Sequence, residues 1–175
     1  MKVLIVIDMQ RDFTTGALGN PETAAVTAPV AAYIRQFRAA NPDGKLIATL
    51  DTHTEDYLNT QEGRKLPVKH CIACSEGLLH EPEVAEALGQ EAVLLEKPTF
   101  GAVSLPGIIG SGEEIEAFQV IGICTDICVI SNAMILKAAY PEIPVQVIAD
   151  CCAGVTPQSH DTALAAMAAC QIEIL

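Results

Sequence analysis

The stretch Ile121-Gly122-Ile123-Cys124-Thr125-Asp126-Ile127-Cys128-Val129 passes directly from an apolar strand into a helix. Residues 117–123 are apolar enough to predict a buried strand, and residues 125–139 predict a helix. Thr125 suits the N-cap of that helix, with Asp126 in the first turn, where the helix dipole favours a negative charge. A buried strand followed at once by a helix is typical of a parallel sheet covered by helices.

The same alternation repeats along the rest of the chain. Apolar segments predict strands at residues 2–8, 45–50, 92–96, 145–149 and 172–175, and helical patterns occupy residues 22–39, 81–88 and 157–169. This order predicts an α/β fold, a three-layer α/β/α domain with a mostly parallel, doubly wound (Rossmann-like) central sheet, formed by residues 1–175 as a single domain. Residues 52–79 and 98–112 lack clear periodicity, and irregular segments of this length are usually functional.

Composition and charge exclude several classes of partner. Lysine and arginine number 10 against 22 acidic residues, a formal charge of −12, so nucleic acid and anionic membranes are unfavourable partners. The apolar run at residues 3–7 is shorter than the hydrophobic stretch of a signal peptide, and no segment is long enough to span a bilayer. We therefore expect a cytoplasmic protein, in which the seven cysteines are reduced thiols.

Cys128 is the candidate nucleophile. It lies about three residues into the predicted helix, where the dipole and free backbone N–H groups are expected to stabilise a thiolate and lower its pKa. The same N–H groups could hold an oxyanion. On the local sequence alone, a buried structural thiol is an equal alternative.

Two other strand ends offer the groups that a cysteine nucleophile needs. Ligands bind beyond the carboxyl ends of the strands in doubly wound sheets, and the commonest strand order sets the first strand beside the fourth. Asp8 would then approach Cys128 as its base, and Lys97 would keep Asp8 ionised. The alternatives are that Asp8 only caps the following turn and that Lys97 is a solvated surface lysine.

A second set of residues has the composition of a metal site. Asp51 and His53 follow the second strand, and Glu62 and His70 lie in the irregular stretch after it. Two imidazoles with one or two carboxylates suit a divalent zinc, iron or manganese ion. From spacing alone, histidines making ordinary hydrogen bonds are the better-favoured alternative.

The remaining cysteines suggest a different kind of protein. Cys71 and Cys74 have the spacing of a redox or zinc pair, and with Cys124 and Cys128 they could form a four-thiolate zinc site. The first pair lies in a loop and the second at a helix start, so this alternative is less favoured. Cys151 and Cys152 are interpreted as core or loop residues, and Cys170 receives no role.

Four motifs in order along the chain resemble the isochorismatase-like cysteine hydrolases. They are Val6-Ile7-Asp8-Met9-Gln10-Arg11-Asp12-Phe13, Asp51-Thr52-His53, Lys97-Pro98-Thr99-Phe100-Gly101 and Gly122-Ile123-Cys124-Thr125-Asp126-Ile127-Cys128. The resemblance implies a catalytic triad of Asp8, Lys97 and Cys128. It also implies a cis peptide just before Cys124, and an oxyanion hole made by the backbone N–H groups of Cys124 and Cys128.

Within that superfamily the chain is similar to the metal-binding nicotinamidase and pyrazinamidase branch. The resemblance assigns Asp51, His53 and His70 as ligands of a divalent metal, zinc before iron or manganese, with Glu62 fitting the fourth position better than Asn59. It implies a substrate pocket walled by Phe13, Leu66, Phe100 and Ile123. Many nicotinamidases have a tryptophan before the last metal histidine, whereas this chain has no tryptophan and Leu66 lies nearest.

These observations predict a cysteine-dependent amidohydrolase. The substrate class is a small-molecule amide, with nicotinamide, converted to nicotinate and ammonia through a thioester, as the best candidate. Another small-amide or carbamoyl (ureido-acid) hydrolase on the same triad is the first alternative. A thiol-rich metal or redox binding module is the second. The sequence leaves open whether the protein is a homo-oligomer.

Overall fold

A computed structural model describes residues 1–175 and contains one six-stranded sheet. The strands lie in the order β3-β2-β1-β4-β5-β6, and all five neighbouring pairs are parallel. Their bounds are Lys2–Ile7 for β1, Lys45–Asp51 for β2, Val93–Lys97 for β3, Ala117–Ile123 for β4, Val145–Ala153 for β5 and Glu173–Ile174 for β6. The predicted doubly wound α/β fold is confirmed, including β1 beside β4.

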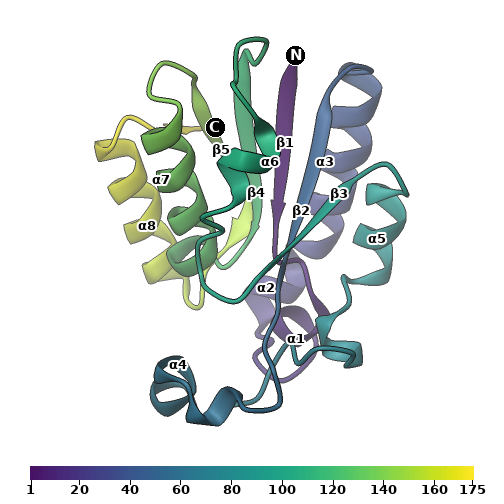
Figure 1. The fold of residues 1–175 in the computed structure, drawn as a ribbon, viewed down its shortest axis with the longest axis vertical. Helices are drawn as coiled ribbons and strands as arrows, with labels where there is room; N and C mark the ends of the chain where they lie inside the picture. The colour runs from purple at the N-terminus through teal and green to yellow at the C-terminus, as the bar shows by residue number, and fades with distance from the viewer.

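The alternating side chains of β1 divide the core between the two faces of the sheet. Val3, Ile5 and Ile7 belong to one hydrophobic cluster, which includes residues of α7 (Ile130–Ala139), α8 (Pro157–Ala169) and α6 (Leu105–Ile109). Leu4 and Val6 belong to the other, which includes residues of α3 (Thr27–Ala40) and α5 (Pro82–Leu88). Successive side chains of a strand point to opposite faces, so β1, which is apolar from Val3 to Ile7, is covered on both sides (Figure 1).

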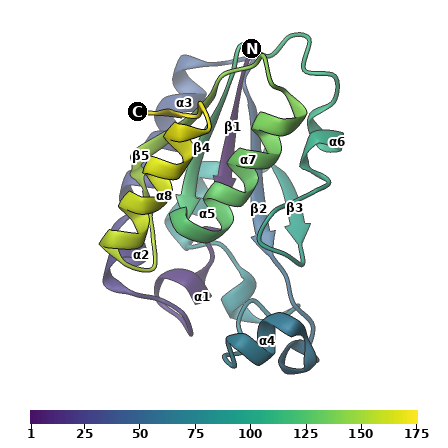
Figure 2. The same cartoon turned by 90° about the vertical axis from the view of Figure 1, so that its left-hand side faces the viewer.

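Short helices gather beyond the carboxyl ends of the strands, where the site was expected (Figures 1 and 2). The first two follow β1: α1 (Arg11–Thr14) and α2 (Pro21–Ala25). The segment at residues 52–79, predicted to be irregular, contains the 3-10 helices η1 (Tyr57–Asn59) and η2 (Glu76–Leu78) and the short α4 (Gln61–Lys65). None of the helices in the fold is long and apolar enough to cross a membrane.

The helix predicted at residues 22–39 is two helices. Asn20 begins α2 with a capping box that involves Thr23, and Pro21 occupies the first turn. Pro29 has no N–H group to donate to the carbonyl of Ala25, so one continuous helix would lack that bond. The structure breaks the helix at Val26, and α3 begins at Thr27.

The fifth strand was predicted to end at residue 149, and this was wrong. β5 continues to Ala153, with Cys152 paired to Gly122 and Ala153 to Ile123. Asp150 resembled a strand terminus because it is charged, but it lies within β5 with its side chain exposed. The longer β5 moves the following loop, which contains Val155, to the carboxyl edge of the sheet.

Candidate active site

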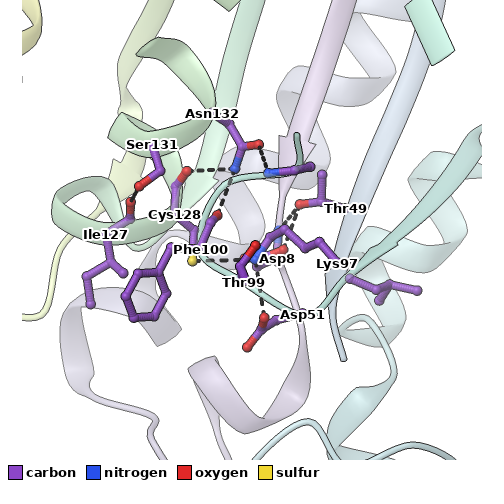
Figure 3. Close-up of polar contacts among 12 residues, drawn as sticks. Asp8, Thr49, Asp51, Lys97, Thr99, Phe100, Ile127, Cys128, Ser131 and Asn132 are labelled. Carbon is purple, nitrogen blue, oxygen red and sulfur yellow. Dashed lines mark hydrogen bonds and ion pairs between the residues drawn. The ribbon is translucent and has the colours of Figure 1, made fainter. Parts of the chain in front are cut away.

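Asp8, Lys97 and Cys128 come together in a buried cluster at the ends of β1, β3 and β4 (Figure 3). The Lys97 Nζ lies 2.7 Å from Asp8 Oδ2, and it donates to Cys128 Sγ at 3.6 Å. Asp8 and Lys97 are at most 1% exposed and Cys128 is 5% exposed. Lys97 is therefore not a solvated surface lysine; it lies between a carboxylate and a thiol.

The Asp8 carboxylate has one oxygen fixed and one available. Thr49 donates its hydroxyl to Asp8 Oδ1 at 2.6 Å and accepts the Asp8 backbone N–H at 3.2 Å. Oδ2 contacts the Lys97 ammonium but accepts no directed hydrogen bond. An oxygen with an unused lone pair beside a thiol can accept the thiol proton.

Burial governs the ionisation of this cluster. Burial raises the pKa of Asp8, and the Lys97 charge opposes that rise. Burial alone would lower the pKa of Lys97, but Asp8, Cys128 and Asp51 together raise it, so the ammonium stays charged.

The expectation that the helix start lowers the pKa of Cys128 was wrong. Burial raises the pKa of Cys128 well above its ordinary value, and Asp8 adds to the rise, while Lys97 opposes it. The thiol is thus protonated at rest at neutral pH and needs a base.

The turn after β4 places Cys128 by an unusual backbone path. Gly122 has φ +116°, and a Cβ there would lie 2.1 Å from the carbonyl oxygen of Ile7. Only glycine permits so close an approach of β4 to β1. The Ile123–Cys124 peptide is cis, as the family resemblance implied.

The helix after this turn does not begin as the sequence predicted. Residues Thr125–Val129 form a π-helical turn, η3, before α7, and its N-cap is Cys124 without a side-chain cap. Thr125, predicted to be the cap, is buried and its hydroxyl instead pairs with His160 Nδ1 at 2.8 Å. Asp126 accepts the backbone N–H of Val155 at 3.2 Å, which ties η3 to the loop after β5.

Asp51, His53 and His70 form the expected second cluster beside the first. The potential ligand atoms of these three residues all lie within 4.8 Å of one another. His53 Nε2 is 2.9 Å and His70 Nε2 is 3.5 Å from Asp51 Oδ2. Asp51 also lies 3.3 Å from Lys97 Nζ, so the two clusters share one buried lysine.

Glu62 completes this cluster and Asn59 does not. Glu62 Oε1 lies 3.7 Å from His53 Nε2 and 3.8 Å from His70 Nε2, because α4 begins one residue after the N-cap Thr60 and turns Glu62 inward. Asn59 is exposed and donates its side-chain amide to Asp56.

The tautomer of His70 suits a divalent cation. His70 Nδ1 pairs with the carbonyl of Val68 at 2.8 Å, so it carries the proton and leaves a lone pair on Nε2, which faces the carboxylates. The Tyr57 ring is fully buried against both imidazoles, 4.7 Å from His53 and 4.9 Å from His70 between ring centroids. Two imidazole nitrogens and the Asp51 carboxylate within 4.8 Å of one another, with the Glu62 carboxylate nearby, fit zinc, iron or manganese.

A cavity of about 220 Å³ opens onto both clusters. Phe13, Leu66 and Phe100 line it as expected, together with Cys128. Ile123 does not. Its side chain is fully buried in the core cluster on the α3 face of the sheet, because the last residue of β4 points away from the cavity.

Four further lining residues were missed from the sequence: Leu18, Asn20, Ile127 and Val155. Leu18 and Asn20 lie in the loop after α1, and Val155 follows β5, the strand whose end was misplaced. Of these four residues, only Ile127 could have been inferred from the sequence, because it directly precedes the candidate nucleophile.

The four-thiolate alternative does not form. The group of three or more potential metal ligands in this structure is Asp51, His53 and His70, and it contains no thiol. All seven cysteines are free; Cys71 is buried and Cys74 is exposed.

The sequence matches the family model of the isochorismatase domain over residues 2–175. The chain belongs to the isochorismatase family.

Solved structures resemble this isochorismatase-family protein along their full length. The pyrazinamidase of Pyrococcus horikoshii in complex with zinc has a TM-score of 0.84 at 27% identity, covering 99% of this chain and 98% of that one. The nicotinamidase/pyrazinamidase of Bacillus subtilis has a TM-score of 0.84 at 21% identity, with coverages of 99% and 98%. The N-carbamoylsarcosine amidase of Thermoplasma acidophilum has a TM-score of 0.79 at 21% identity, with coverages of 99% and 94%. No curated protein sequence matches the chain.

In this isochorismatase-family protein, two residues of the first motif hold the second cluster in place. The Gln10 side chain donates to the carbonyl of Asp51 at 2.9 Å and accepts its N–H at 2.7 Å, while a further bond reaches Leu78. Asp12 accepts the backbone N–H of Cys71 at 2.8 Å, next to His70. The motif after β1 thus fixes the backbone on both sides of the metal-ligand candidates, a role that the sequence did not reveal.

Proposed function

We propose that this isochorismatase-family hydrolase is a cysteine amidase that cleaves a small uncharged amide, with nicotinamide as the best candidate. The observation that carries the proposal is the shared cavity: the thiol of Cys128 and the cluster of Asp51, Glu62 and His70 face the same space of about 220 Å³. A thiol with its own base on one side and a polar anchor on the other suits a short substrate held at both ends.

The reaction begins with a proton transfer. Asp8 Oδ2 takes the proton of the Cys128 thiol, and the sulfur attacks the amide carbonyl carbon, forming a C–S bond and a tetrahedral oxyanion. Backbone N–H groups of Cys124 and Cys128 hold this oxyanion, and one such donor is worth about 3–4 kcal/mol in other enzymes. Asp8 then gives its proton to the nitrogen, the C–N bond breaks, and ammonia leaves a thioester.

Hydrolysis of the thioester restores the site. Asp8 takes a proton from a water molecule, whose oxygen attacks the thioester carbonyl, and the C–S bond breaks to release the carboxylic acid. The proton returns to Cys128. The raised pKa of Asp8 makes its carboxylate a stronger base than an ordinary aspartate, and the adjacent Lys97 keeps it ionised between turnovers.

Asp51, His53, Glu62 and His70 would hold a divalent cation, zinc before iron or manganese. When bound, the cation supplies a Lewis acid for the ring nitrogen of a pyridine amide, directly or through water. The protein itself contributes the apolar walls Phe13, Leu66 and Phe100, which accommodate a flat ring and exclude water.

A ureido-acid hydrolase on the same triad is the second candidate, supported by the similarity to N-carbamoylsarcosine amidase. The charges around the cavity favour the neutral amide. A ureido acid carries a carboxylate, whereas no lysine or arginine lines the cavity to pair with it. Lys97 does not line it and is already paired with Asp8 and Asp51.

The test is ammonia release from nicotinamide, pyrazinamide, several aliphatic amides and a carbamoyl amino acid, with and without a chelator. We expect the aromatic amides to be preferred and the chelator to reduce that preference. Cys128→Ala should abolish turnover while Cys74→Ala, which removes an exposed thiol, leaves it unchanged. Substantial turnover by Cys128→Ala would refute the nucleophile, and hydrolysis of the carbamoyl substrate alone would favour the second candidate.

A further inference from the structure

Asn132 is a fully buried polar side chain of α7, four residues after Cys128 (Figure 3). Its Nδ2 donates to the carbonyl of Cys128 at 2.8 Å and to the carbonyl of Phe100 at 3.1 Å. Its Oδ1 accepts the backbone N–H of Ala102 at 2.9 Å. Both N–H groups and the oxygen of the amide are therefore used, and two of the three bonds leave its own helix.

Asn132 binds the segment around Gly101, which crosses over the sheet after β3. β3 and β4 are separated by β2 and β1, so the chain after Lys97 must pass to the β4 side before it enters α6 (Figure 1). Asn132 joins this segment on both sides of Gly101, in the way that a neighbouring strand would. The segment passes close to α7 at Gly101, where a Cβ would lie 2.7 Å from the terminal methyl group of Ile135.

Phe100 is the part of this segment that faces the cavity. Its side chain lines the cavity and is 45% exposed, while its carbonyl is fixed by Asn132. The same amide group holds the carbonyl of Cys128. One buried side chain thus sets the position of an aromatic wall relative to the candidate nucleophile.

We propose that Asn132 is a positioning residue for substrate selection: it fixes Phe100 at the spacing from Cys128 that fits a flat aromatic amide. The proposal rests on the amidase function proposed above. It assigns Asn132 no contact with substrate. Its loss should therefore reduce the binding of flat substrates and leave the reactivity of the thiol intact.

The kinetic test compares Asn132→Leu with Ser131→Ala. Ser131 is the matched control, since its hydroxyl bonds only to Ile127 in the same helical segment, at 2.6 Å. We expect Asn132→Leu to raise the KM for nicotinamide by about 3- to 10-fold, the factor that one neutral hydrogen bond is worth. The KM for an aliphatic amide and the kcat for both substrates should change less than about twofold, a smaller factor than one such bond. Asn132→Asp, which keeps the acceptor for Ala102 but loses both donors, tests the same contact if Asn132→Leu unfolds.

A second measurement does not depend on amidase activity. The rate of Cys128 alkylation, followed by peptide mass spectrometry, is compared for iodoacetamide and for its N-phenyl derivative. The wild type should favour the phenyl reagent and Asn132→Leu should lose that preference, with the iodoacetamide rate unchanged. If the wild type hydrolyses no aromatic amide but shows this phenyl preference, the proposed substrate fails and the role of Asn132 stands. The inference would be overturned if Asn132→Leu slowed alkylation by both reagents equally and raised the KM of both amides equally. It would also be overturned if the variant changed none of these rates and constants.

Discussion

Replacing Lys97 with methionine removes the cation that lies between two buried carboxylates. Lys97 Nζ is 2.7 Å from Asp8 and 3.3 Å from Asp51, and all three side chains are at most 3% exposed. Methionine keeps most of the volume of the lysine stem, so the change tests charge and not packing. The variant leaves two buried carboxylates without the cation that lay between them.

The magnitude follows from these distances. At an effective dielectric constant of about 20, unit charges at these separations attract by about 6 and about 5 kcal/mol before the cost of desolvation is subtracted. Desolvation removes much of this gain, and breaking a buried ion pair by deleting one partner typically costs about 3–5 kcal/mol. We expect Lys97→Met to lower the free energy of unfolding by that amount at pH 7.

The loss should depend on pH in a defined direction. In Lys97→Met, burial raises the pKa of Asp8 with no lysine to oppose it. The folded state then keeps a proton that the unfolded chain has released, so stability falls as pH rises from about 4, the ordinary carboxyl value, through the raised pKa. The difference in the free energy of unfolding between Lys97→Met and the wild type should therefore become smaller below pH 7. For one proton it changes by at most about 1.4 kcal/mol per pH unit.

Urea unfolding at pH 5 and pH 7, with chelator present, measures both effects. Lys69→Met is the matched control, because Lys69 pairs with Glu55 at the same 2.7 Å but is 44% exposed, and exposed pairs contribute about 0–1 kcal/mol. The double variant Asp8→Asn/Lys97→Met should recover part of the loss at pH 7. A Lys97→Met effect below about 1 kcal/mol that is the same at both pH values would refute the reasoning, since buried pairs cost more.

Three further outcomes are expected. Glu62→Gln should weaken zinc affinity by about tenfold or more, measured by competition with a chromogenic chelator, whereas Asn59→Ala should leave it unchanged because Asn59 points to Asp56. Gly122→Ala should lower stability by more than about 2 kcal/mol in thermal unfolding, since φ +116° is unfavourable for alanine and the new Cβ would meet the backbone of Ile7. Gly107→Ala is the control: there is open space around Gly107, so stability should change by less than about 1 kcal/mol. Because burial raises the pKa of Cys128, its alkylation rate should still rise with pH above 9; a plateau below pH 8 would contradict the protonated resting thiol.

The fold could be predicted from the sequence because strands and helices leave their patterns in neighbouring residues. The largely apolar strands β1, β2 and β4, alternating with helical patterns along the chain, indicated a parallel sheet covered on both faces. The two errors in element bounds lie at a charged residue within a strand and at a proline within a predicted helix. Asp150 lies inside β5, and Pro29 divides the helix predicted at residues 22–39.

The site was less completely predictable. Motif order named Asp8, Lys97 and Cys128, and strand order explains why the ends of distant segments meet. The pKa of Cys128 could not be inferred from its place at a helix start, because burial outweighs the helix terminus.

The sequence by itself determined the α/β class, the family and the candidate residues for catalysis and metal binding. Only the tertiary structure decided that Glu62 and not Asn59 faces the histidines, that Ile123 turns into the core, and that Asn132 ties Phe100 to Cys128. The physical reason is one of range. Strands and helices follow from neighbouring residues, whereas burial, charge pairing and buried hydrogen bonds depend on segments that meet only after the chain crosses the sheet.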